Sequence, residues 1–123
     1  MHGAHNYPFH KEISKLDIAL KEGTDDKEYL SLLQSHLSVI LAKTNYDLAF
    51  YLSGVDILDS DKFGKLNISM EGCRQRDRVV FSMLRSCGIP CVVAMGGGYS
   101  PDIRRVVDAH CNTFREARDV YGV

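Results

Sequence analysis

The most informative segment of the chain is Leu48-Ala49-Phe50-Tyr51-Leu52-Ser53-Gly54-Val55-Asp56. Its first five residues form a continuous apolar run, which is short enough for a β-strand buried on both faces, as parallel sheets require. The run ends at a glycine and then at the carboxylate of Asp56. A second run of this kind, residues 91–95, leads directly into Gly96-Gly97-Gly98-Tyr99. The two runs predict two buried strands of a parallel sheet.

Further elements are expected around these two strands. Residues 16–20 alternate between apolar residues and small or polar ones, which predicts another strand. Three helices are predicted from capping residues followed by apolar residues at helical spacing. The capping residues are Asp25, Ser69 and Ser100, the last with Pro101 at the first helical position. Strands alternating with helices predict an α/β fold, a three-layer parallel sheet with helices on both faces and right-handed crossovers.

Length and composition limit the class of protein. A chain of 123 residues is the size of one domain, and 45% hydrophobic with 25% charged residues is ordinary for a globular protein. The formal net charge of -1 supplies no field for gathering phosphates, so nucleic acid is a poor default partner. No apolar run is long enough for a membrane helix, and the first residues lack the parts of a signal peptide. We therefore expect a cytoplasmic protein whose four cysteines are buried free thiols.

Two candidate site features follow the two buried strands. Ligands of open parallel sheets bind beyond the carboxyl ends of the strands, where Asp56 and residues 96–99 would face the same crevice. Asp56 is a candidate metal ligand or acid/base group, with a loop carboxylate that caps backbone amides as the alternative. The glycines permit positive φ, so that Tyr99 can project its phenol into a narrow site, or they form an ordinary turn between strand and helix.

Other motifs fail on spacing. A dinucleotide fingerprint would need a third glycine where the chain has Pro101, and no P-loop lysine is present. Residues 59–64 begin like a calcium loop, but Phe63 occupies a ligand position and Met70 stands where the bidentate glutamate belongs. An Asp-x-His pair at residues 108–110 falls within a predicted helix, where residues two apart cannot bind one ion. Anion binding at the start of the last helix is disfavoured by the bulky side chains there.

Four motifs occur in a characteristic order along the chain. They are His2-Gly3-x-His5-Asn6-Tyr7-Pro8-Phe9, Leu16-Asp17-Ile18-x-Leu20-x-x-Gly23-Thr24-x-Asp26-x-Glu28-Tyr29, Gly54-Val55-Asp56-Ile57-Leu58-x-x-Asp61-x-Phe63-Gly64-x-Leu66-x-Ile68-Ser69 followed by Arg76-Asp77, and Gly96-Gly97-Gly98-Tyr99. Together they resemble the C-terminal part of the histone deacetylase superfamily, in particular its class IV-like and bacterial branch. The resemblance covers essentially the whole chain.

The resemblance implies an arginase/deacetylase-like fold and a zinc-dependent amidohydrolase that removes acetyl or longer acyl groups from a lysine or polyamine nitrogen. Asp56 matches a zinc-ligand position of the family, and Tyr99 matches its transition-state tyrosine, which donates a hydrogen bond to the developing oxyanion. The positions that match the lining of the family's substrate tunnel are Tyr7, Pro8, Phe9, Gly97 and Gly98.

The sequence also departs from the family. The family's Asp-x-His zinc pair and His-His dyad, found in its N-terminal half, have no counterpart here. One carboxylate does not hold a catalytic zinc, which takes three protein ligands. We therefore expect residues 1–123 to be the C-terminal part of a deacetylase domain, inactive as an isolated chain, with Zn²⁺ bound in the complete domain.

An incomplete sheet predicts self-association. The strand without its neighbours would present an unpaired edge and exposed apolar faces, so a homo-oligomer is expected. His2, His5 and His10 are either metal ligands at such an interface or solvated side chains. A non-catalytic, self-associating α/β module with a vestigial site is the alternative to a deacetylase, and the preferred acyl substrate stays open.

Overall fold

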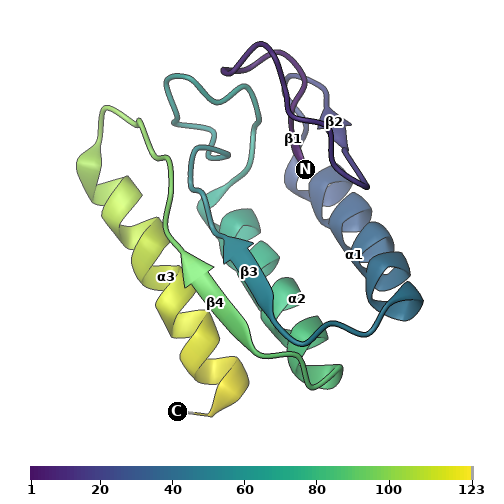
Figure 1. The fold of residues 1–123 in the computed structure, drawn as a ribbon. Helices are drawn as coiled ribbons and strands as arrows, with labels where there is room; N and C mark the ends of the chain where they lie inside the picture. Colours follow the sequence, from purple (N-terminus) through teal and green to yellow (C-terminus); the bar gives the residue numbers. More distant parts are fainter. Residues whose placement is uncertain (123) are drawn as a thin grey trace.

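The computed structural model describes residues 1–122 of the chain, with helices and short parallel strands alternating along it (Figure 1). The elements in chain order are β1 (His2–Gly3), β2 (Ala19–Leu20), α1 (Asp26–Lys43), β3 (Ala49–Leu52), α2 (Met70–Ser86), β4 (Cys91–Ala94) and α3 (Ile103–Tyr121). No helix within residues 1–122 combines the length and the apolar character needed to cross a membrane.

The two predicted buried strands form one parallel ladder. β3 pairs with β4 from Ala49 opposite Cys91 to Leu52 opposite Ala94. The ladder continues past the strand ends, because the backbone N–H of Val55 donates to the carbonyl oxygen of Gly96 over 3.1 Å. The residues that follow each strand are therefore held side by side. A second parallel ladder joins β1 to β2 and is separate from the first.

The helices form a single layer on one face of the β3–β4 sheet. α2 lies between α1 and α3 (Figure 1). Ala49 and Tyr51 pack against apolar side chains of α1 and α2. On the opposite face Phe50 and Leu52 are 73% and 77% exposed, and Val92 is exposed as well. The predicted α/β fold with parallel strands is confirmed, but the expected second layer of helices is not formed by residues 1–122, and these strands are buried on one face only.

The strand predicted at residues 16–20 is shorter in the structure. Only Ala19 and Leu20 belong to β2. Just before them the side chain of Asp17 accepts hydrogen bonds from the backbone N–H and the hydroxyl of Ser14, both over 2.8 Å. This local turn competes with strand formation, as short polar side chains often do. Leu16 is consequently exposed although it fits the alternating pattern.

Two of the three predicted helix caps are correct. Asp25 accepts from the backbone N–H of Glu28 at the start of α1, and Ser69 accepts from the backbone N–H of Gly72 at the start of α2. The third prediction is wrong, because α3 is capped by Asp102 rather than by Ser100. The hydroxyl of Ser100 instead accepts from the backbone N–H of Asp102. Ser100 therefore belongs to the loop before α3.

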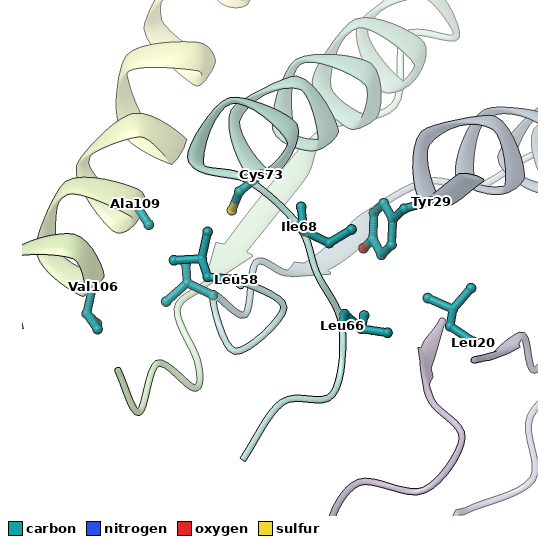
Figure 2. Close-up of a cluster of buried hydrophobic side chains, with 9 residues drawn as sticks. Leu20, Tyr29, Leu58, Leu66, Ile68, Cys73, Val106 and Ala109 are labelled. Carbon is teal, nitrogen blue, oxygen red and sulfur yellow. The ribbon is translucent and has the colours of Figure 1, made fainter. Parts of the chain in front are cut away.

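The main core anchors the long loop between β3 and α2. Figure 2 shows its side chains as a band that runs from α3, past α2, to α1 and β2. The buried members are Leu20, Tyr29, Val55, Leu58, Leu66, Ile68, Cys73, Val106 and Ala109. Four of these come from the loop itself, which has almost no regular secondary structure. Their burial fixes the loop against the helices, and the loop in turn carries the candidate site.

The cysteines differ from the predicted burial. All four are free. Cys73 is buried in the core, whereas Cys87 is exposed at the end of α2. Cys91 and Cys111 are half-buried, so the predicted burial is correct for Cys73 alone.

Candidate active site

Asp56 and Tyr99 lie in the same cavity beyond the carboxyl ends of β3 and β4. The cavity has a volume of about 440 Å³. Its lining residues are Asn6, Tyr7, Asp56, Phe63, Gly64 and Tyr99. The ladder places the two predicted residues there, since each follows one of its two paired strands.

Asp56 lines this cavity and is half-buried. Burial, and then the nearby charge of Asp61, raise the pKa of its carboxyl group above the ordinary value of 3.8. Gly97 packs directly against it, since a Cβ atom at that position would lie 2.7 Å from Cγ of Asp56. Gly97 also has a φ of +62°, a conformation that side chains disfavour. Both the space and the backbone therefore require a glycine at this position.

Gly98 serves the core rather than the cavity. Its φ is +98°, and a Cβ atom there would lie 2.7 Å from Val106 and 2.8 Å from Val55. The glycine run thus brings the backbone close to a carboxylate at one position and to α3 at the next. Neither Gly97 nor Gly98 is among the residues that line the cavity.

Of the three aromatic and proline positions near the N-terminus, one reaches the cavity. Tyr7 is among its lining residues although 80% of its surface is exposed, whereas Pro8 and Phe9 are exposed and do not line it. The ring of Phe9 packs edge-on against that of Tyr7, with 6.3 Å between the centroids.

Tyr99 stands at the rim of the cavity with 53% of its surface exposed. Its ring packs against that of Phe63, at 5.3 Å between centroids and 66° between planes. Its backbone N–H donates to Oδ2 of Asp61 over 2.7 Å. Tyr99 is therefore held by two residues of the loop between β3 and α2.

Asp61 also organises its own loop. Its Oδ1 accepts from the backbone N–H of Phe63 over 2.8 Å and from that of Gly64 over 2.7 Å. The segment that begins like a calcium loop thus uses this carboxylate to bind backbone amides. Sequence reasoning gave Asp61 no role of its own, although an aspartate followed at the third position by glycine is typical of such turns.

A buried charge network lies beneath the site. Arg76 and Asp77, adjacent on α2, form an ion pair in which their side chains are 4% and 0% exposed. Asp77 also accepts hydrogen bonds from the hydroxyls of Tyr51 and Thr113. Arg76 donates to the carbonyl oxygen of Gly54, two residues before the candidate metal ligand. The network therefore ties α2, α3 and β3 to the backbone that carries the site, a role that the sequence pattern did not reveal.

The described residues supply only part of a metal site. Within residues 1–122 no three His, Cys, Asp or Glu side chains are grouped so that they could hold a metal ion. The N-terminal histidines do not supply such a group. Asp56 fits as a single carboxylate ligand that faces a cavity, but a catalytic zinc takes three protein ligands. A zinc ion at Asp56 would need ligands from other residues.

Solved structures of similar fold come from deacetylase-like proteins. A histone deacetylase homologue crystallised with SAHA has a TM-score of 0.73 at 20% identity, and the match covers 98% of this chain and 33% of that one. An acetylpolyamine aminohydrolase from Burkholderia pseudomallei has a TM-score of 0.72 at 14% identity, covering 85% of this chain and 29% of that one. At these identities the likeness shows the fold alone.

Related sequences point to the same group. An uncharacterized protein of Picosynechococcus sp. is 41% identical over 121 residues, which are 98% of this chain and 40% of that protein. Histone deacetylase 2 of Arabidopsis thaliana is 34% identical over 110 residues, 87% of this chain and 28% of that protein. The chain thus spans well under half the length of these relatives. Residues 1–114 match the histone deacetylase domain, and the chain belongs to the histone deacetylase family.

Proposed function

We propose that the chain supplies one side of the active site of a zinc-dependent amidohydrolase, which removes acetyl or longer acyl groups from a lysine or polyamine nitrogen. The observation that carries this proposal is the meeting of Asp56 and Tyr99 in one cavity of about 440 Å³. Relatives described as a histone deacetylase and as an acetylpolyamine aminohydrolase support the substrate class.

Asp56 is the proposed metal ligand on this side of the cavity. A bound zinc ion would polarise the amide carbonyl and lower the pKa of a water molecule. Burial makes an uncompensated carboxylate unfavourable at Asp56, so a cation beside it relieves a cost that the fold otherwise bears. Close packing of Gly97 and Gly54 against the side chain limits where the carboxylate can point.

Tyr99 is the proposed hydrogen-bond donor to the reacting carbonyl. When water adds to an amide, the carbonyl oxygen becomes an oxyanion, and a donor aimed at that oxygen stabilises the transition state. The phenol of Tyr99 suits this task because its ring stands at the rim, held by Phe63, while its hydroxyl is free of any hydrogen bond to the described residues. Tyr7, Phe63 and Tyr99 also give the cavity an aromatic wall suited to a methylene chain.

The experiment uses a chimera, because the chain lacks a complete ligand set. The matching segment of the Picosynechococcus protein is replaced with the 121 residues of this chain that match it. Zinc content and hydrolysis of acetyl-lysine peptides and acetylated polyamines are then measured beside the parent protein. The isolated chain is expected to hold no stoichiometric zinc and to be inactive.

Three variants of the chimera separate the roles. Asp56→Ala should lose zinc, whereas Tyr99→Phe should keep zinc and lower kcat by about 10²- to 10³-fold, the usual effect of removing one oxyanion donor. Asp59→Asn, in the same loop, should change neither. Full zinc content in Asp56→Ala, or full activity in Tyr99→Phe where the parent protein is active, would contradict the proposal.

The bare sheet face favours self-association of the isolated chain as a second property. Phe50 and Leu52 are largely exposed, β3 and β4 each have an unpaired edge within the described residues, and neither strand contains a charged residue. We propose that a second copy covers this face, since two uncharged apolar faces meet without repulsion.

Light scattering should give the mass of a dimer, which Phe50→Lys lowers to that of a monomer. The control Ile13→Lys, at a position 93% exposed, should stay dimeric. A monomeric wild-type chain would exclude this property.

A cytoplasmic location is proposed from the four free cysteines. Exposed free thiols persist where the surroundings are reducing. Alkylation of freshly lysed cells should label Cys87 fully, and a mixed disulfide at that residue would argue for an oxidising compartment.

A further inference from the structure

The segment that carries Tyr99 has very few hydrogen bonds to the rest of the chain. Residues 97–101 make no backbone–backbone hydrogen bond in the described part of the chain. Two of them, Gly97 and Gly98, are glycines with positive φ. The hydrogen bond from Tyr99 N–H to Asp61 is the one that joins this segment to another element in residues 1–122.

We propose that Asp61 is the positioning residue for Tyr99 and sets where the phenol stands over the cavity. The inference rests on the proposed role of Tyr99 and deepens it. Asp61 acts through two routes, since Oδ2 holds the backbone of Tyr99 while Oδ1 holds the backbone of Phe63, whose ring contacts that of Tyr99. The carboxylate of Asp61 therefore positions both the backbone and the ring of Tyr99.

The geometry needs a carboxylate and not merely a polar side chain. Three backbone N–H groups converge on Asp61, two on Oδ1 and one on Oδ2. An asparagine has one carbonyl oxygen, and its amide group would meet a third N–H as donor against donor. Asp61→Asn must therefore release either its own turn or Tyr99, although its size and shape are unchanged.

Asp59 supplies a matched control. It lies two residues before Asp61 in the same loop and pairs with Arg105 of α3 over 2.7 Å, with both side chains 39% exposed. It has no hydrogen bond to Tyr99 or Phe63. Asp59→Asn therefore tests a general weakening of the loop without loss of the attachment.

The experiment is NMR of the complete 123-residue chain, labelled with ¹⁵N and ¹³C. In the wild-type chain we expect the Tyr99 amide to exchange at least about tenfold more slowly than those of Gly97 and Gly98, because a hydrogen bond to a charged acceptor is among the stronger ones. We also expect a nuclear Overhauser effect between the rings of Tyr99 and Phe63.

Asp61→Asn should abolish both the slow exchange of the Tyr99 amide and the Overhauser effect between the two rings, while the amides of α2 and β4 keep their protection. Asp59→Asn should leave both observations unchanged. The proposal is overturned if Tyr99 exchanges as fast as its glycine neighbours in the wild-type chain, a result that requires no variant to fold. Equal changes in the two variants would overturn it as well. The NMR measurement needs neither metal nor hydrolysis. A negative NMR result would refute the positioning role of Asp61, whereas an unchanged kcat of Tyr99→Phe in the chimera would refute the catalytic role of Tyr99.

Discussion

Replacing Asp77 with alanine is expected to destabilise the chain more than any surface change. The Asp77 side chain is completely buried and neutralises Arg76, of which only 4% is exposed. It also accepts hydrogen bonds from Tyr51 and Thr113. Alanine would leave a buried guanidinium without a counterion and two hydroxyls without their acceptor.

The size of the loss follows from this geometry. Removing one partner of a buried ion pair costs about 3 to 5 kcal/mol, because the other charge remains buried and uncompensated. A domain of this size has a free energy of unfolding of about 5 to 15 kcal/mol, so the variant keeps only part of its stability. Asp77→Asn should lose less, since its amide oxygen can still accept one of these hydrogen bonds.

Urea denaturation followed by circular dichroism measures the effect. With a typical slope of about 1 to 3 kcal/mol per molar urea, the midpoint should fall by at least about 1 M in Asp77→Ala. The control is Asp119→Ala, which breaks an ion pair with Arg118 whose side chains are 62% and 46% exposed, and it should cost at most about 1 kcal/mol. Equal losses in the two variants would refute the reasoning that burial makes the Arg76 pair important.

Three further predictions concern the site and the thiols. Asp56→Asn should raise the free energy of unfolding of the metal-free chain at pH 7. Because the pKa of Asp56 is raised in the folded chain, the wild-type chain loses stability as the pH rises above 3.8. The stability gained by Asp56→Asn should therefore vanish below pH 3.8 when urea unfolding is measured over a series of pH values. A gain that persists below that pH would contradict the raised pKa. Gly97 and Gly88 both have positive φ, so alanine at either position should cost about 1 to 2 kcal/mol of backbone strain. Gly97→Ala should destabilise more, because only at Gly97 would the new Cβ meet a neighbour, the side chain of Asp56. Equal urea midpoints for the two variants would count against this contact. Cys87 should react with a disulfide reagent at pH 8 at once, while Cys73, whose thiol pKa burial raises to about 11, should react only on unfolding.

The sequence predicted the elements whose signals are local. β3 and β4 were recognisable because each is a short apolar run bounded by turn residues, and Asp25 and Ser69 because a cap is a contact within four residues. Ser100 was a misleading cap, since Asp102 was equally suitable and lies closer to the helix. The burial of both strand faces could not be judged, because it depends on what packs there rather than on the strand itself.

The sequence predicted those candidate site residues that come soon after the end of a recognisable strand. Asp56 and Tyr99 come four and five residues after the ends of β3 and β4, so the parallel register brings their loops to the same end of the sheet. The sequence did not reveal that Asp61, Arg76 and Asp77 hold the backbone of the site in place. Their contacts with Gly54, Tyr51, Thr113 and Tyr99 span between 22 and 38 residues of the chain, and no pattern of spacing records such contacts.

The register of the β3–β4 ladder also governs the order of folding. Ser53 of the β3 end bonds to Ala94 of the β4 end across 41 residues of sequence, and no parallel pair can close through a short hairpin. On the ribosome the backbone of β3 therefore stays unpaired until the whole of α2 and then β4 have left the exit tunnel. Loop closure over this distance is slow compared with helix formation, so we expect α1 and α2 to form before the ladder closes.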